Sequence, residues 1–348
     1  MMFKNFWYAV EFSNAITKRS TLITLMGKKM VVYRDSQGRV VALDNRCAHR
    51  GASLAGGWVE GDCIRCPYHG WRYQADGSCS EIPANPAAIP IPKRARVEAY
   101  PVQEKYGFIW IFIGDLPERD LFEISASADR PPLPSFPQFE NPTREPSQSV
   151  YTFDAHFTRT MENTLDVSHA PFMHRGSVGK SKTPENTVIE DYDLEVTEWG
   201  LSATLGIKIN RINGPMRFFL REDDQDPWKQ YIFAPPNITY SGVNFGRFKI
   251  ESILAHIPVD ENTTIVKSVS IRSFLNHTPL ISNWLDHNTA QVGTRICMED
   301  NVVVQTQLPR LAPLHNSTEL MVASDATLIA YRKLLKKFSE MEWMMEAS

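Results

Sequence analysis

The sequence predicts an α+β fold in two domains: an all-β amino-terminal domain, then a domain that combines an antiparallel sheet with long helices. Residues 3 to about 115 contain only short β-branched runs separated by turn residues. Beyond a proline-rich stretch at 130–146, strand-like runs continue and helical patterns appear beside them. A chain of 348 residues is long enough for two hydrophobic cores.

Two hairpin signals and one apolar run define the first domain. Residues 28–45 hold two β-branched runs around a Gln-Gly turn, and residues 71–82 repeat the pattern around Asp-Gly. The run YGFIWIFIG at 106–114 is typical of a buried strand. We therefore expect this domain to span residues 1–116.

Proline recurs in the next segment, where it blocks both helix and central strand, so we assign residues 117–147 to an extended linker. The second domain then covers residues 148–348. Strand-like runs in it lie near 150–157, 187–211, 229–234, 238–255 and 264–274. Helices are expected at about 157–170, 280–307 and 325–338.

The composition is that of an ordinary soluble protein, with 43% hydrophobic and 22% charged residues. The net charge of −3 gives no attraction to nucleic acid or to anionic membranes. No stretch approaches the ~18 apolar residues of a membrane span, and the amino terminus lacks the features of a secretion signal. Five cysteines, an odd number, argue against a disulfide framework. We expect a cytoplasmic protein that binds neither nucleic acid nor membranes.

Two short motifs, Cys47-x-His49 and Cys66-x-x-His69, are the most informative feature of the chain. Two thiolates and two imidazoles can hold a [2Fe–2S] cluster in which one iron takes sulfur ligands and the other nitrogen, which raises the reduction potential. A structural zinc site is the alternative, but its usual motifs pair Cys with Cys and His with His. Each motif here carries one cysteine and one histidine, so we prefer the iron–sulfur cluster.

The residues around these motifs fit that interpretation. Gly51, Pro67 and Gly70 suit tight turns that bring backbone N–H groups toward the sulfur atoms. Cys63 and Cys66 also form a Cys-x-x-Cys pair, but the chain has no second pair of this kind. Cys63 and Cys79 are therefore expected to be small buried residues.

The sequence MENTLDVSHAPFMH contains a second candidate metal site. It brings together Glu162, Asn163, Asp166, His169 and His174. On an unbroken helix Asp166 and His169 would be neighbours, whereas His169 and His174 would splay by about 140°. Pro171 disfavours helix at the preceding residue, so we expect the helix to bend or stop there and return His174 toward His169.

Two histidines need a carboxylate to complete the facial triad that holds non-haem iron(II) with open positions for O2 and substrate. Asp166, Asp286 and Asp300 are the candidates. Asp166 is too close in sequence to His169 to serve. Asp300 lies on a long predicted helix that can cross the first one, and we prefer it, although the spacing alone leaves Asp286 open.

With both motifs in place, the chain resembles the Rieske non-haem iron oxygenases from NFWYAV near its start to EDNVVVQTQ near its end. It resembles in particular the dicamba- and vanillate-demethylase type of monooxygenase and the cyanobacterial enzymes that hydroxylate saxitoxin-type alkaloids. The resemblance implies a Rieske [2Fe–2S] domain followed by a helix-grip-type catalytic domain. It also implies one such cluster and one mononuclear Fe(II) per chain, with O2 as cosubstrate.

The resemblance assigns roles to individual residues. Cluster ligands would be Cys47, His49, Cys66 and His69, and ligands of the mononuclear iron would be His169, His174 and Asp300. Asp166 matches the aspartate that, in the family, bridges an iron-ligating histidine to a cluster-ligating histidine of the neighbouring subunit. That implies electron transfer between His69 of one subunit and His169 of the next, in a head-to-tail homotrimer. Asn163 falls where the family often has a polar residue near the iron.

The implied function is that of an enzyme. It would take electrons from a ferredoxin or an NAD(P)H-dependent reductase and hydroxylate a C–H bond of a ring-containing small molecule, or demethylate it oxidatively. Alternatives are cis-dihydroxylation of an aromatic ring, a Rieske electron-transfer protein without oxygenase activity, and a zinc-stabilised binding module. A mere electron carrier needs no second iron, which favours the oxygenase.

Four arginines surround the cluster loops: Arg46, Arg50, Arg65 and Arg72. They suit either docking of an acidic electron donor or salt bridges that stiffen the loops, and the sequence does not separate the two.

Overall fold

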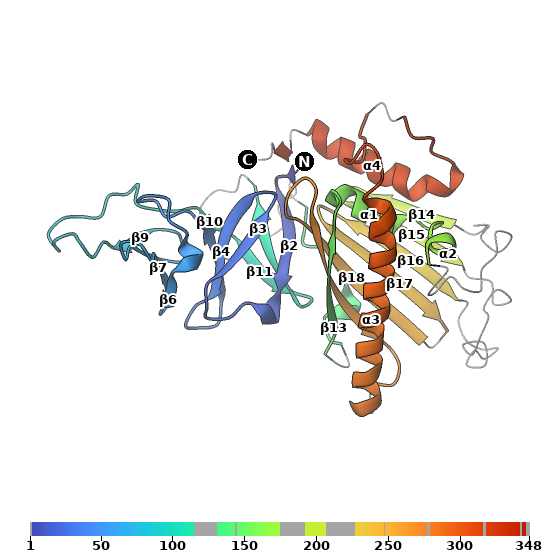
Figure 1. Ribbon diagram of the computed structural model, residues 1–348, viewed down its shortest axis with the longest axis horizontal. Helices are drawn as coiled ribbons and strands as arrows, with labels where there is room; N and C mark the ends of the chain where they lie inside the picture. The colour runs from blue at the N-terminus through green and yellow to red at the C-terminus, as the bar shows by residue number, and fades with distance from the viewer. Residues whose placement is uncertain are drawn as a thin grey trace. The chain divides into compact units, whose positions relative to one another are not determined.

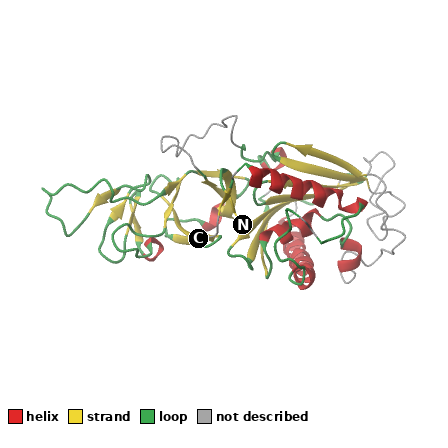
Figure 2. Cartoon of the chain, turned by 90° about the horizontal axis from the view of Figure 1, so that it is seen from above, coloured by secondary structure: helices red, strands yellow, loops and turns green. Residues whose placement is uncertain are grey.

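The structure, a computed structural model, describes residues 2–114, 131–142, 145–174, 192–206, 227–246, 248–276, 279–315, 318–341 and 343–345. The chain divides into two compact units (Figure 1): Met1–Leu133 with Met345–Ser348, and Pro134–Met344. Strands dominate the first unit, whereas the second combines a large sheet with the α-helices (Figure 2). The predicted α+β fold is confirmed. Of the predicted linker, the described part contains one turn of 3-10 helix, η4 (Pro137–Phe139).

The first unit is built from short antiparallel strands. They are β1 (Met2–Phe3), β2 (Phe6–Phe12), β3 (Thr21–Leu25), β4 (Lys28–Arg34), β5 (Val40–Asp44), β6 (Trp58–Glu60), β7 (Cys63–Arg65), β8 (Arg72–Tyr73), β9 (Cys79–Glu81), β10 (Ala99–Tyr100), β11 (Val102–Lys105) and β12 (Phe108–Ile113). Three sheets have the orders β10-β5-β4-β3, β11-β12-β2 and β6-β7-β8-β9. Two 3-10 turns, η1 (Ser13–Ala15) and η2 (Leu54–Gly56), connect strands, and β1 pairs with the short β20 (Met344–Met345).

Both predicted hairpins are present in this unit. One joins β4 to β5 and the other joins β8 to β9, and Gly38 and Gly77 take the positive φ angles of +83° and +80° that such turns require. The apolar run at 108–113 is strand β12, and all six of its residues are buried. A core that includes Leu43 and Tyr73 also contains the thiols of Cys47 and Cys66, so the loops that carry these cysteines are anchored on it.

The described residues of the second unit form one seven-stranded antiparallel sheet and four α-helices. The strands are β13 (Ser147–Phe153), β14 (Tyr192–Thr197), β15 (Gly200–Gly206), β16 (Trp228–Ala234), β17 (Ile238–Phe245), β18 (Phe248–Pro258) and β19 (Thr264–Arg272), in the order β13-β19-β18-β17-β16-β15-β14. The helices are α1 (Phe157–Leu165), α2 (Ala170–Met173), α3 (Pro279–Val304) and α4 (Ala326–Glu340), with a 3-10 turn η8 (Ala323–Asp325) before the last. The helices predicted at 280–307 and 325–338 are confirmed as α3 and α4.

Helices α1, α3 and α4 all contact the same face of this sheet, which we call the helix face. His256 of β18 bonds to Thr160 of α1 with a distance of 2.9 Å between Nδ1 and Oγ1. Arg272 of β19 pairs with Asp286 of α3 at 3.1 Å. Phe233 of β16 packs edge-on against a tyrosine of α4, with 4.8 Å between ring centroids. Strand registers place these three sheet residues on one side, because side chains alternate between faces.

Two smaller observations complete the fold. Gly293 of α3 faces Tyr151 of β13, and a Cβ atom at this glycine would lie only 2.5 Å from the tyrosine oxygen, so a larger residue would force the tyrosine side chain to move. Within the described ranges, no helix has the length and apolar character needed to cross a membrane.

Candidate metal centres

The two cluster motifs form loops of the same geometry. The backbone oxygen of Cys47 accepts the N–H of Gly51 at 2.8 Å, and that of Cys66 accepts the N–H of Gly70 at 3.1 Å. Both glycines have left-handed backbones, with φ of +71° and +74°. The turns predicted around Gly51 and Gly70 are therefore present.

The two cysteines of the motifs are buried, and the two histidines are exposed. Cys47 and Cys66 are 3% and 1% exposed, whereas His49 and His69 are exposed, with their ring centroids 4.6 Å apart. The Tyr73 hydroxyl lies 3.1 Å from Sγ of Cys47. Two buried sulfur donors beside two outward nitrogen donors fit a [2Fe–2S] cluster with one sulfur-ligated and one nitrogen-ligated iron.

Electrostatics shift the two kinds of candidate ligand in opposite directions, raising the pKa of the Cys66 thiol and lowering the pKa of the His49 imidazole. Burial raises the pKa of the Cys66 thiol, while hydrogen bonds from the backbone N–H groups of Tyr68 and His69 oppose that rise by stabilising the thiolate. Desolvation, followed by the charges of His69 and Arg50, lowers the pKa of His49, which keeps its imidazole in the neutral form that binds metals. Cys63 and Cys79 are buried, as expected.

The second candidate site begins where α1 ends, and here the predicted helix at 157–170 is wrong in its extent. Helix α1 stops at Leu165 because Asp166 has an extended backbone, with ψ of 118°. Its Oδ1 accepts hydrogen bonds from the N–H and the hydroxyl of Ser168 at 2.7 and 2.8 Å. Such a side-chain turn competes with helix, and helical spacing alone does not predict it.

Pro171 also acts differently from the expectation. It does not end the first helix but lies in the first turn of the short helix α2, where a missing N–H costs nothing. His169 therefore precedes α2 and His174 follows it. The expected return of His174 toward His169 does occur, with the two ring centroids 5.5 Å apart.

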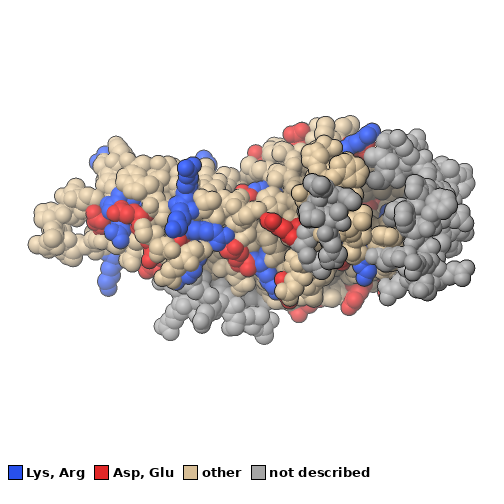
Figure 3. Space-filling view, turned by 90° about the horizontal axis from the view of Figure 1, so that it is seen from below, with Lys and Arg blue, Asp and Glu red and all other residues tan. Residues whose placement is uncertain are grey.

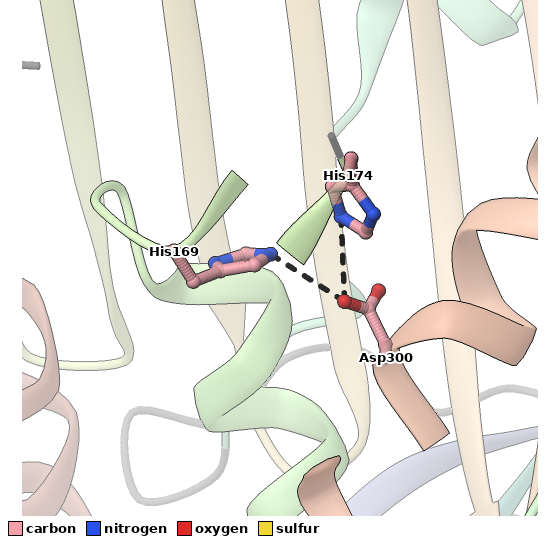
Figure 4. A group of neighbouring side chains, drawn as sticks. All are labelled: His169, His174 and Asp300. Atoms are coloured by element: carbon pink, nitrogen blue, oxygen red, sulfur yellow. Dashed lines mark ion pairs between the residues drawn. The ribbon is translucent and has the colours of Figure 1, made fainter. Parts of the chain in front are cut away.

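His169, His174 and Asp300 form a compact group (Figure 4), in which one ligand atom from each lies within 4.8 Å of the others. Oδ1 of Asp300 lies 3.3 Å from Nε2 of His174 and 3.7 Å from Nε2 of His169. This oxygen is buried and has no hydrogen-bond partner among the described residues. A buried carboxylate oxygen that faces two imidazole nitrogens and has no hydrogen-bond donor fits a metal ion.

Hydrogen bonds at the far side of each ring set its orientation. Nδ1 of His169 lies 3.0 Å from the backbone oxygen of Asp166, and Nδ1 of His174 lies 2.9 Å from Oε2 of Glu299. When Nδ1 carries the proton and donates it to these acceptors, the lone pair of Nε2 points toward Asp300. Both imidazoles are thus held in the tautomer that a metal ion requires.

Glu299 was not predicted from the sequence. It precedes Asp300 on α3, and its Oε1 accepts a hydrogen bond from Nε of Arg295 at 3.1 Å. No spacing rule could identify it, because its partner His174 comes from a distant segment of the chain.

Of the other residues that the sequence suggested for this site, Asn163 and Asp166 lie beside the metal group, whereas Asp286 does not. Asn163 hydrogen-bonds to Asp300, which opposes the rise that burial causes in the pKa of that carboxyl group. Oδ2 of Asp166 lies 3.7 Å from Nδ1 of His169. Asp286, the alternative third ligand, instead pairs with Arg272 and lies about 21 Å from Asp300 along α3 at 1.5 Å per residue.

Glu162 takes part in a buried ring of ion pairs, and no contact joins it to the metal group within the described residues. Its carboxylate pairs with Arg159 at 2.7 Å and with Arg332 of α4 at 2.5 Å. Glu319 closes the ring with contacts of 2.7 and 2.6 Å to the same two arginines. This ring fixes α1 against α4 and so positions the segment that carries the two histidines.

Comparisons with known proteins agree with this geometry. Residues 6–101 match the family described as Rieske [2Fe-2S] domain, and residues 153–341 match the vanillate O-demethylase oxygenase C-terminal domain. The iron-sulfur subunit TsaM1 of the toluene-4-sulfonate monooxygenase system of Comamonas testosteroni is 27% identical over 363 residues, 98% of each chain. Methylxanthine N1-demethylase NdmA of Pseudomonas putida is 28% identical over 354 residues, 97% of this chain and 89% of the relative.

Solved structures give the same result. A mutant of the Pseudomonas putida CBB5 enzyme NdmA with theobromine superposes with a TM-score of 0.78 at 25% identity, covering 97% of this chain and 91% of the other. Dicamba monooxygenase bound to dicamba has the same fold, with a TM-score of 0.77 at 21% identity over 97% of this chain and 98% of the other.

Fold and donor sets together define an iron-dependent oxygenase. The chain belongs to the Rieske non-haem iron oxygenases, in the group that carries the vanillate O-demethylase oxygenase C-terminal domain. It is therefore an oxidoreductase of the monooxygenase type, whose cofactors are a Rieske [2Fe–2S] cluster and a mononuclear iron.

Proposed function

We propose that this enzyme hydroxylates a C–H bond of a ring-containing small molecule, or removes a methyl group from it oxidatively, with O2 and two electrons. The group of His169, His174 and Asp300 is the observation that carries the proposal, because it fits an iron with positions open to O2 and substrate. The names of two relatives support the substrate class, since toluene-4-sulfonate and methylxanthines both contain rings.

The metal ligands follow from the donor sets. Cys47, His49, Cys66 and His69 would hold the cluster, and His169, His174 and Asp300 would hold the mononuclear iron. When bound, the cluster supplies single electrons and the mononuclear iron supplies the site of O2 activation. Asp166 and Glu299 keep the two imidazoles in the ligating tautomer, and Asn163 holds the Asp300 carboxylate.

Asp166 is proposed as the electron-transfer bridge between subunits. Its side chain is 25% exposed beside His169, so another chain can reach it, and His69 is exposed at the outer side of its loop. An exposed imidazole on one chain and a partly exposed carboxylate on another can meet in a head-to-tail interface, and such an interface can close into a ring. We therefore propose a homotrimer in which His69 of one subunit contacts Asp166 of the next.

The electron donor is proposed to be a ferredoxin or an NAD(P)H-dependent reductase. Arg65 pairs with Glu60 and Glu81, so it stiffens the loops, whereas Arg46 and Arg50 are exposed. The face in Figure 3 carries Lys and Arg beside Asp and Glu rather than a field of one sign. Docking by charge would thus depend on a small local group that includes Arg50.

A cytoplasmic location is proposed from the cysteines. None of the five forms a disulfide in the structure, and cysteines without disulfides are typical of a reducing compartment.

The experiment is turnover by reconstituted enzyme with its reductase, O2 and a panel of methoxyarenes and N-methylated heterocycles. Gain of one oxygen identifies hydroxylation, and loss of CH2 with release of formaldehyde identifies demethylation. Gain of two oxygens and two hydrogens would instead favour cis-dihydroxylation. Reversible reduction without any product would favour an electron-transfer protein.

A further inference from the structure

Lys229 of β16 projects from the helix face of the large sheet. In the strand registers it lies opposite Leu205 of β15 and Val243 of β17. Tyr231 is two residues further along the strand, so its side chain is on the same face, about 7 Å away. Because Phe233 shares this alternation and packs against α4, all three residues face the helices.

The helix face near Lys229 is also the face of the iron site. Burial and then the charge of Asp166 raise the pKa of Tyr231 to about 12, and the charge of Asp166 also contributes to the raised pKa of Tyr192 on β14. The carboxylate of Asp166 is therefore close enough to act on both tyrosines. Asp166 is three residues before His169, and it directly follows α1, which contacts β16. Lys229 therefore lies on a strand that packs against α1, one strand step from Tyr231.

The ammonium of Lys229 has no counter-charge in the part of the chain that the structure describes. No carboxylate there forms an ion pair with it, and its cross-strand neighbours Leu205 and Val243 are apolar. Its side chain is partly buried, and burial alone lowers the pKa of the ammonium. A partly desolvated cation without a partner is costly, and such groups are normally paired.

Hydroxyl groups extend the polar surface from Lys229 across the helix face. Ser241 lies opposite Tyr231, and Ser252 lies opposite Ser241. The hydroxyl of Ser252 is 2.7 Å from that of Ser270, on the next strand. These partly exposed hydroxyls can donate hydrogen bonds to polar substituents of a ring that lies over the sheet.

We propose that Lys229 is the residue that selects an anionic substrate, by pairing with a carboxylate or sulfonate carried on the ring. This inference rests on the proposed function and names its substrate class. A compact, partly desolvated ammonium binds such an anion, and the serine hydroxyls then orient the ring. The sulfonate in the name of one relative's system is consistent with an anionic ring compound in this group.

The test measures dissociation constants of the holoenzyme by isothermal titration calorimetry with matched pairs of probes. The pairs are 4-methoxybenzoate with 4-methoxybenzamide, and toluene-4-sulfonate with toluene-4-sulfonamide. We expect the wild type to bind at least one anion about ten- to a hundredfold more tightly than its neutral partner. Lys229→Gln should abolish that preference, and Lys229→Arg should retain most of it.

Lys267→Gln is the matched control, because Lys267 of β19 pairs with Val150 and Ala255 and lies on the opposite face of the same sheet. It should keep the wild-type preference. Equal affinity of the wild type for both members of each pair, or a retained preference in Lys229→Gln, would overturn the role of Lys229. Metal analysis of the same samples tests the proposed function separately, since missing mononuclear iron would contradict that function whatever the calorimetry shows.

Discussion

Nε2 of His174 lies 3.3 Å from Oδ1 of Asp300, although one residue follows the short helix α2 and the other lies near the end of α3. Nε2 of His169 faces the same oxygen from 3.7 Å. Each imidazole is held from behind at Nδ1, by Glu299 and by the backbone of Asp166 respectively. The site is thus organised for a metal ion by partners that do not themselves ligate it.

Glu299→Gln should weaken metal binding at this site about 10- to 100-fold, because the amide no longer fixes the His174 tautomer as strongly. Anaerobic titration of Fe(II) or Co(II) into protein that retains its cluster but lacks the mononuclear metal measures the effect. Arg295→Gln is the control, since this exposed arginine contacts Oε1 of Glu299, whereas His174 contacts Oε2. Wild-type affinity in Glu299→Gln would show that the contact is incidental.

Asp166→Asn should leave both metals bound but slow electron transfer between them. The amide can preserve the turn through its oxygen, but it loses the charge that interacts with His169 and that, in the proposed trimer, would face His69 of the neighbouring subunit. Single turnover with a prereduced cluster measures it: cluster oxidation and product should both fall by an order of magnitude or more. Normal rates of both would remove Asp166 from the electron path.

The sequence predicts those features of the structure that depend on residues close together in the chain. The Cys-x-His and Cys-x-x-His loops are local, so the motif was enough to predict their turns at Gly51 and Gly70. Local sequence patterns also predicted the two hairpins and the helices α3 and α4. The helix predicted at 157–170 was too long, because Asp166 accepts hydrogen bonds from Ser168 in a turn that ends α1, although the sequence spacing there remains helical.

Contacts between distant segments were the harder part. Spacing left Asp286 and Asp300 both open as the third member of the group, and only the tertiary contact of α3 with the residues that flank α2 places Asp300 with the histidines. Glu299 and Lys229 are ordinary charged residues in the sequence. Their significance arises from a partner on another element or from the face of a strand, and strand register is set by tertiary packing.

Tyr73→Phe should lower the reduction potential of the cluster. The Tyr73 hydroxyl can donate a hydrogen bond to Sγ of Cys47, which stabilises the additional negative charge of the reduced state. A hydrogen bond worth about 1 kcal/mol corresponds to about 40 mV for one electron. Redox titration followed by visible absorption measures the shift.

Tyr33→Phe provides the comparison for that measurement. Tyr33 belongs to the same core, but its hydroxyl bonds to the backbone of Asp62 rather than to a cluster cysteine. Its removal should leave the potential unchanged. Equal shifts in both variants would mean that general loosening of the core, rather than the bond to Cys47, sets the potential.

Buried histidines should make the second unit sensitive to acid. His256 is buried between Thr160 and Thr239, and burial lowers its pKa to about 3. Because the unfolded chain binds a proton at about pH 6.5, stability is complete above that pH and is lost as pH falls from about 6.5 toward 3. The contribution is about 1.4 kcal/mol per pH unit.

His256→Gln should therefore lower the melting temperature at pH 7 but reduce its further fall between pH 7 and 5.5. Differential scanning calorimetry at both pH values measures this, with His287→Gln on the exposed surface of α3 as the control. An unchanged pH dependence in His256→Gln would assign the acid sensitivity to other groups.

The most direct test of two separate metal centres is the iron and acid-labile sulfide content of the wild type and of Asp300→Ala after anaerobic reconstitution. The wild type should contain about three irons and about two sulfides per chain, and Asp300→Ala should lose only the iron outside the cluster. A wild type with only two irons, a zinc-only protein, or an Asp300→Ala variant that retains all three irons would contradict the account.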